Sequence, residues 1–171
     1  MSTSKKAAAP PPERFIVLLR HGIAEDATPD KKDEDRGLTS EGHARMKQIA
    51  RGLERALPKV QAIYSSPLLR AVQTALWVSK AYRSRANVNP VDALSPSATP
   101  KQFLALVKSI KERRAVLVGH EPVLTQGLRA LVGVEGIELK KGGCFGVRLL
   151  PDGTAALEWV LPPRILRELG V

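Results

Sequence analysis

The sequence predicts an α/β fold: a three-layer α/β/α sandwich on a mostly parallel sheet with an antiparallel C-terminal edge. Two features of the chain lead to this expectation. Short apolar runs alternate with longer amphipathic segments along most of the chain, which is typical of right-handed strand–helix–strand crossovers. The last two apolar runs are separated only by the turn sequence at residues 151–153, which predicts an antiparallel hairpin.

A single folded domain is expected over residues 14–171. A chain of 171 residues can bury one substantial core but not two ordinary domains and a linker. Residues 1–13 are small, polar and rich in proline, which predicts a disordered tail. No apolar stretch is long enough for a secretory signal or a membrane span. Because Cys144 is the only cysteine, no internal disulfide can form. This favours a cytoplasmic protein, and we also expect a monomer.

The first strand and the first helix are expected between residues 15 and 57. Residues 15–22 form an apolar run that is too short for a typical helix and ends in a polar turn with a glycine. Such a run is typical of a central strand buried on both faces. Residues 38–57 place apolar side chains at helical spacing, with Thr39 or Ser40 as the cap and Pro58 as the end.

A second strand and a second helix are expected at residues 60–66 and 68–84. Pro67 opens this helix, because its fixed φ suits the first turn. One side of the helix is predicted to face the core. That side carries Leu69, Val72, Leu76 and Ser79.

The rest of the chain continues the alternation. The expected elements are an extended piece at 88–96, helices at 99–113 and 122–133, and strands at 115–120, 144–150 and 154–161. In open parallel sheets, ligands bind at the carboxyl ends of the strands. His21 and His120 each follow a predicted buried strand at that end.

The triplet Arg20-His21-Gly22 ends the first strand. A neutral imidazole, with an ordinary pKa of about 6.5, is a nucleophile that needs no separate base near neutral pH. Taken alone, a histidine at a strand end is more often incidental than catalytic. Arg70 near the start of a helix and His120 ahead of another helix would both suit an oxyanion, although each one alone is more simply a surface or structural residue.

Lys and Arg outnumber Asp and Glu by 27 to 17, a formal charge of +10. This surplus favours anionic partners without selecting one. The basic residues are spread along the chain without interleaved aromatic residues, so we expect no dedicated nucleic-acid module.

Four sequence segments resemble the histidine phosphatase superfamily, which includes the phosphoglycerate mutases. They are VLLRHGIAE at residues 17–25, RGLTSEG at 36–42, SSPLLRAVQTA at 65–75 and VLVGHEP at 116–122. The segments occur in the family's order, and the short chain is most similar to the bacterial phosphohistidine phosphatases of the SixA type.

The resemblance implies a phosphoglycerate mutase-like fold and a role for each matched residue. His21 would carry the phosphoryl group transiently, while Arg20, Arg70 and His120 would bind its oxygens, with Arg36 as a further candidate. No metal or cofactor is implied. Such donors oppose the charge of the transferring group.

The proton donor is less obvious from the sequence. Relatives that act on sugar phosphates use a glutamate after the second helix, where this chain offers only Asp92. Glu121 and Glu25 are the other candidates, as is Asp26, although each is more simply a solvated loop carboxylate. His43 is expected on a solvated helix face.

A weak supply of acid favours a P–N substrate, because imidazole is a far better leaving group than an alkoxide. The sequence therefore predicts a phosphatase for phosphohistidine in signalling or phosphotransfer proteins. The alternatives are a phosphatase for small phosphate esters such as phosphosugars, and a non-catalytic phosphate-binding module with the same fold.

Overall fold

The structure, a computed structural model, describes residues 11–83 and 87–171. Six strands form one sheet in the order β3-β2-β4-β1-β5-β6. Most of the predicted tail, residues 1–10, and the predicted end of the second helix at Ser84 lie outside the described residues. The strands are β1 (Arg14–Arg20), β2 (Ala62–Ser65), β3 (Val88–Pro90), β4 (Arg114–Gly119), β5 (Cys144–Leu149) and β6 (Ala155–Leu161).

The pairing of the strands confirms the predicted sheet. β3, β2, β4 and β1 run parallel to one another, whereas β5 runs antiparallel to β1 and to β6. β1 and β4 lie side by side in the middle, and Arg20 is in register with Gly119. The residues that follow these two strands therefore emerge at the same edge of the sheet.

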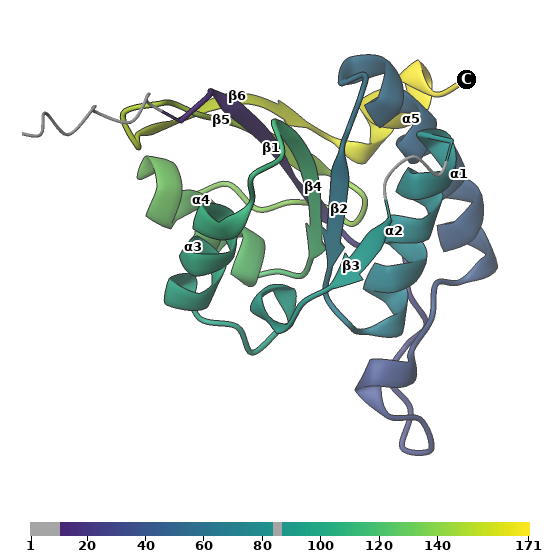
Figure 1. The fold of residues 1–171 in the computed structure, drawn as a ribbon. Helices are drawn as coiled ribbons and strands as arrows, with labels where there is room; N and C mark the ends of the chain where they lie inside the picture. The colour runs from purple at the N-terminus through teal and green to yellow at the C-terminus, as the bar shows by residue number, and fades with distance from the viewer. Residues whose placement is uncertain (1–10, 84–86) are drawn as a thin grey trace, which may run out of the picture.

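The helices cover both faces of the sheet and complete the three layers (Figure 1). One layer holds α1 (Ser40–Ala56), α2 (Leu69–Ala81) and α5 (Pro163–Leu169), and the other holds α3 (Pro100–Ser109) and α4 (Val123–Val132). Two short 3-10 helices, η1 (Asp33–Asp35) and η2 (Asp92–Leu94), lie in the connections. Within the described ranges, no helix is both long and apolar enough to cross a membrane.

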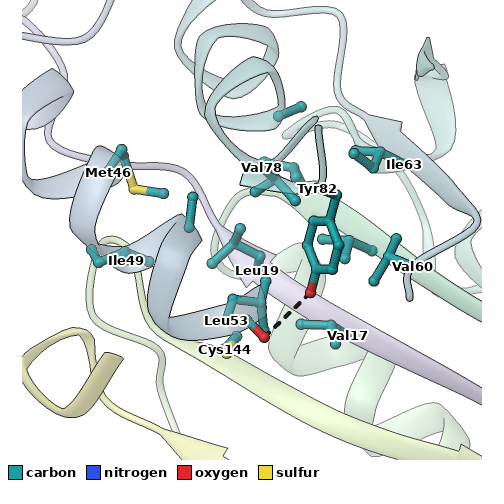
Figure 2. Packing of buried hydrophobic residues seen from close by; sticks show 14 of the residues in the cluster. Val17, Leu19, Met46, Ile49, Leu53, Val60, Ile63, Val78, Tyr82 and Cys144 are labelled. Atoms are coloured by element: carbon teal, nitrogen blue, oxygen red, sulfur yellow. Dashed lines mark hydrogen bonds between the residues drawn. The ribbon is translucent and has the colours of Figure 1, made fainter. Parts of the chain in front are cut away.

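Alternation along β1 divides the core into two parts. Val17 and Leu19 face the α1, α2 and α5 layer, while Ile16 and Leu18 face the α3 and α4 layer. All four side chains are fully buried, as expected for a central strand of a parallel sheet. The first of these clusters is shown in Figure 2.

Local signals set several helix ends. The Thr39 side chain accepts a hydrogen bond from the Gly42 N–H at the start of α1, and Thr99 forms a capping box with Gln102 at the start of α3. At the end of α4, Gly133 adopts a left-handed conformation with φ 72°, which glycine reaches without steric cost. The Tyr82 hydroxyl, after α2, donates to the Leu53 carbonyl of α1 at 3.2 Å (Figure 2).

The predicted core-facing side of α2 is wrong. Leu69 and Leu76 are 39% and 54% exposed, whereas Ala71, Ala75 and Val78 are fully buried. Small side chains let α2 pack closely against the rest of its layer, so the larger leucines turn outward. The third predicted helix is also too long, because α3 ends at Ser109 rather than at residue 113.

The C-terminal helix α5 was not predicted. It packs on α1 at Gly52, where an added Cβ would lie 1.8 Å from the Leu166 carbonyl oxygen. Gly170 makes a similar approach to the Gln48 carbonyl. The contact needs glycine within α1 and directly after α5, so it depends on tertiary packing rather than on the short sequence of α5 itself.

Candidate active site

The ends of β1 and β4 bring two imidazoles together. His21 and His120 follow the two strands directly, and their ring centroids lie 5.0 Å apart. The His21 N–H donates to the Gly119 carbonyl at 3.1 Å, which continues the ladder between the strands. Both side chains are buried, with 7% and 3% of their surfaces exposed.

A single hydrogen bond sets the tautomer of His21. Its Nδ1 lies 2.7 Å from the Gly22 carbonyl oxygen. A carbonyl can only accept, so Nδ1 carries the proton in this contact and Nε2 keeps its lone pair when the ring is neutral. Burial, together with the smaller effects of the Arg70 and Arg20 charges, lowers the pKa of His21 to about 4, although the Gly22 contact acts in the opposite direction. The imidazole is therefore neutral at pH 7.

His120 is fixed from the neighbouring strand β2. Its Nε2 lies 2.8 Å from the Ser66 hydroxyl, and Ser66 follows β2 directly. Burial lowers the pKa of His120 to about 3, with contributions from His21 and Arg70. His120 is thus also neutral at pH 7 and can donate or accept a hydrogen bond.

Arg70 lies in the first turn of α2 and is only 4% exposed. Thr74 joins this turn to the end of β1, since its hydroxyl accepts from the Gly22 N–H at 3.0 Å and donates to the Arg70 carbonyl at 2.8 Å. Thr74 therefore holds the start of α2 against the loop after His21. No feature of the sequence alone indicates this role for Thr74.

Asp33 of η1 bridges two arginines. Arg70 donates through Nη1 to the Asp33 carbonyl at 2.7 Å and through Nη2 to Asp33 Oδ2 at 3.0 Å. Arg36 donates through Nε to Asp33 Oδ1 at 2.9 Å, and through Nη1 to the Glu25 carbonyl at 2.7 Å. These hydrogen bonds from Arg36 and Arg70 lower the pKa of Asp33. Asp33 was also missed from the sequence.

Arg20 retains an unused donor. Its Nη1 donates to the Leu139 carbonyl and lies 3.6 Å from a carboxylate oxygen of Glu138. Its Nε is buried and has no hydrogen-bond partner among the described residues. A buried donor without a partner is costly, so this N–H is suited to an anionic ligand.

A cavity of about 240 Å³ joins these side chains at the carboxyl edge of the sheet. The structure thus brings together His21, Arg20, Arg70 and His120 from separate segments, along with Arg36 and Glu121. Glu25 and Asp92 are not among the lining residues. The full lining consists of Arg20, His21, Ala24, Asp33, Arg36, Arg70, Pro96, His120, Glu121 and Lys141.

The candidate proton donors Glu121, Glu25 and Asp92 differ in their surroundings. Glu121 accepts from the Thr125 hydroxyl at 2.8 Å and from the Leu139 N–H at 3.0 Å, so its carboxylate joins α4 to the following loop. Glu25 accepts from Lys31 at 2.7 Å, and Asp92 starts η2 with an exposed side chain.

The remaining histidine, His43, forms a hydrogen bond with a tryptophan. His43 accepts a hydrogen bond at Nδ1 from Trp77 Nε1 at 3.0 Å and does not line the cavity. Within residues 11–83 and 87–171, no group of three or more His, Cys, Asp or Glu side chains is arranged to hold a metal ion.

Comparison with known proteins places this arrangement in a family. The family model of the histidine phosphatase superfamily (branch 1) matches residues 16–95. An uncharacterized protein of Picosynechococcus sp. is 34% identical over 139 residues, which cover 78% of this chain and 84% of the relative. The chain belongs to the histidine phosphatase superfamily.

Several solved structures have the same fold as this chain. The protein histidine phosphatase SixA in complex with tungstate has a TM-score of 0.81 at 20% identity, covering 89% of this chain and 99% of that one. A SixA protein of Agrobacterium tumefaciens gives 0.75 at 25% identity, covering 88% and 98%. A phosphoglycerate mutase of Bacillus anthracis gives 0.77 at 13% identity, covering 94% and 98%. The predicted phosphoglycerate mutase-like fold is confirmed, and family and fold together support phosphatase activity.

Proposed function

We propose that this protein is a phosphohydrolase that forms a phosphohistidine intermediate on His21 and removes phosphate from phosphohistidine in signalling or phosphotransfer proteins. The observation that carries the proposal is the tautomer of His21. Because Nδ1 donates to the Gly22 carbonyl, the lone pair of a neutral ring resides on Nε2. The cavity that His21 lines is rich in cationic donors, as an anion requires.

In the first step, the Nε2 lone pair of His21 attacks phosphorus as the bond to the leaving group breaks. The electron pair of that bond remains with the leaving atom. Arg20, Arg70 and His120 donate to the phosphoryl oxygens, where charge must be stabilised during transfer. Arg20 Nε can be one of these donors without breaking a hydrogen bond within the protein, because it has no partner among the described residues. Once phosphorylated, the His21 ring is positively charged, and its Nδ1–H remains bonded to the Gly22 carbonyl.

In the second step, a water oxygen attacks phosphorus and the P–Nε2 bond breaks. The electron pair returns to Nε2, the water proton passes to solvent, and inorganic phosphate leaves. The lowered pKa of His21, about 4, favours this step, because the ring is released in its stable neutral form.

The surroundings of the carboxylates support a P–N substrate. Glu121 is the only candidate donor in the described cavity lining, and its carboxylate accepts from Thr125 and Leu139. We assign it to anchoring this loop instead of proton donation. A phosphohistidine ring protonated on its second nitrogen leaves as neutral imidazole and needs no donor, unlike an alkoxide.

The experiment compares His21 with His43, a histidine outside the cavity lining. Wild type, His21→Gln and His43→Gln are assayed with a phosphohistidine peptide, an aryl phosphate and a sugar phosphate. We expect His21→Gln to lower kcat/KM on the order of 10⁴-fold. His43→Gln, altered outside the cavity, should stay near wild type.

The substrate panel separates the remaining candidates. The proposal requires the phosphohistidine peptide to have the highest kcat/KM. Faster turnover of the sugar phosphate would move the assignment to small esters. No turnover of any compound, with phosphate still bound, would indicate a phosphate-binding module.

A further inference from the structure

Asp33 is one of two carboxylates, with Glu121, in a cavity lining that is otherwise rich in cations. Its carboxylate takes a donor from Arg70 on one oxygen and from Arg36 on the other. It also lines the cavity beside His21 and His120. The guanidinium N–H groups that bind this carboxylate are not free for a ligand while these contacts last.

The two ends of this contact differ in exposure. The Arg70 side chain is 5% exposed, whereas that of Asp33 is 58% exposed. Asp33 belongs to the three-residue helix η1, which contains no buried residues, and Figure 1 shows this segment projecting from the body of the molecule. The carboxylate is therefore the partner that can move, while Arg70 is held by its surroundings.

An oxyanion that approaches Arg70 encounters Asp33 in one of two ways. It can displace the carboxylate and take over its donors, or it can bind beside the carboxylate and be repelled by it. Both ways weaken the binding of a bare phosphate. Asp33 weakens the binding of a phosphoryl group on a positively charged ring less, because the charge of the ring offsets the charge of Asp33.

We propose that Asp33 is a charge-selectivity residue, which weakens binding of free phosphate and simple phosphate esters relative to phosphoryl groups on a positively charged nitrogen leaving group. This inference rests on the proposed function for its substrate class. The effect on free phosphate, however, follows from the contacts of Asp33 alone. Such discrimination works by repelling the wrong ligand as well as attracting the right one.

The test measures inorganic phosphate binding by titration calorimetry for the wild type and three variants. Asp33→Asn keeps the shape of the side chain and removes its charge, and we expect it to bind phosphate roughly three- to tenfold more tightly. Asp33→Glu keeps the charge and should not show this gain in affinity. Asp35→Asn removes the same charge from the same 3-10 helix at a residue that does not line the cavity, and it should change affinity less than about twofold.

The direction of the change separates selectivity from simple support. If Asp33 served only to hold Arg70 in place, Asp33→Asn would bind phosphate more weakly, and that result would overturn the proposal. Unchanged affinity would overturn it as well. Thermal unfolding of each variant checks that the fold is retained.

A second measurement addresses the substrate class. We expect Asp33→Asn to reduce the ratio of kcat/KM for the phosphohistidine peptide to that for the aryl phosphate by roughly three- to tenfold. A constant ratio would contradict the selectivity. If the wild type hydrolysed neither compound, the proposed function would fail while the phosphate titration still decided the role of Asp33.

Discussion

Two cation-rich hollows lie at opposite edges of the same sheet, and they differ in burial. At the carboxyl edge, the cavity of about 240 Å³ holds the buried Arg70 between the imidazoles and Asp33. At the amino edge, a hollow of about 590 Å³ is lined by four cations. They are Arg14, Lys59, Arg113 and Arg114.

The larger hollow is rich in cations, as an anion site is, but its cations are less buried than Arg70. None of its four cations forms an ion pair with another described residue, and Lys59 and Arg113 are exposed. Exposed cations are screened by water and interact weakly. The comparison teaches that fixed, desolvated donors beside a nucleophile define a site better than charge or volume does.

The largest expected difference between the two hollows is in catalysis. Arg70→Ala removes a buried guanidinium from the smaller cavity, and we expect kcat/KM for an aryl phosphate to fall on the order of 10²- to 10³-fold. Arg113→Ala removes an exposed guanidinium from the larger hollow and should leave kcat/KM within about twofold. Steady-state kinetics gives kcat/KM for the aryl phosphate in both variants. Comparable losses in the two would break the comparison.

Acid should destabilise the protein through the smaller cavity. His21 has a pKa of about 4 when folded and about 6.5 when unfolded. The unfolded state therefore binds more protons between these values, so stability is complete above pH 6.5 and is lost as pH falls toward 4. Between pH 7 and 4.5 we expect this group to contribute a loss of roughly 2 kcal/mol.

Urea unfolding of wild type and His21→Gln at both pH values measures this loss. The variant lacks the titrating ring, so its stability should fall less on acidification. An equal fall in the two proteins would contradict the lowered pKa of His21. The hollow at the amino edge has no histidine in its described lining.

The sequence predicted the parts of the site that depend on strand ends. Short buried runs that end in polar residues placed His21 and His120 at one edge, because neighbouring parallel strands finish together. The sequence did not predict the role of Asp33, which lies in a charged segment and binds Arg70, a residue 37 positions further along the chain. No periodicity links those two positions. The roles assigned to the site residues stay predictions until they are tested.

The errors in the fold have a similar origin. Spacing alone suggested that the leucines of α2 face the core, but close packing favoured Ala71 and Ala75. Helix α5 is seven residues long and is defined by its contact with Gly52 of α1. Both features depend on which surfaces meet in three dimensions, and one sequence does not specify that directly.

The smallest expected effect compares two exposed lysines. Lys141 lines the smaller cavity and contributes to the lowered pKa of His21, whereas Lys59 lines the larger hollow. We expect Lys141→Ala to raise KM for an aryl phosphate about two- to fivefold at low salt, and less at high salt. Lys59→Ala should leave KM unchanged at either ionic strength, and an equal increase would contradict the distinction.

The most direct test of the central claim is to trap the phosphorylated enzyme. Wild type and His21→Gln are mixed with a ³²P-labelled phosphohistidine peptide, quenched with alkali within milliseconds, and digested for mapping of the label. The account predicts alkali-stable, acid-labile label on the peptide that contains His21, and none in the variant. Label on another residue, or steady turnover with no labelled protein at any quench time, would contradict it.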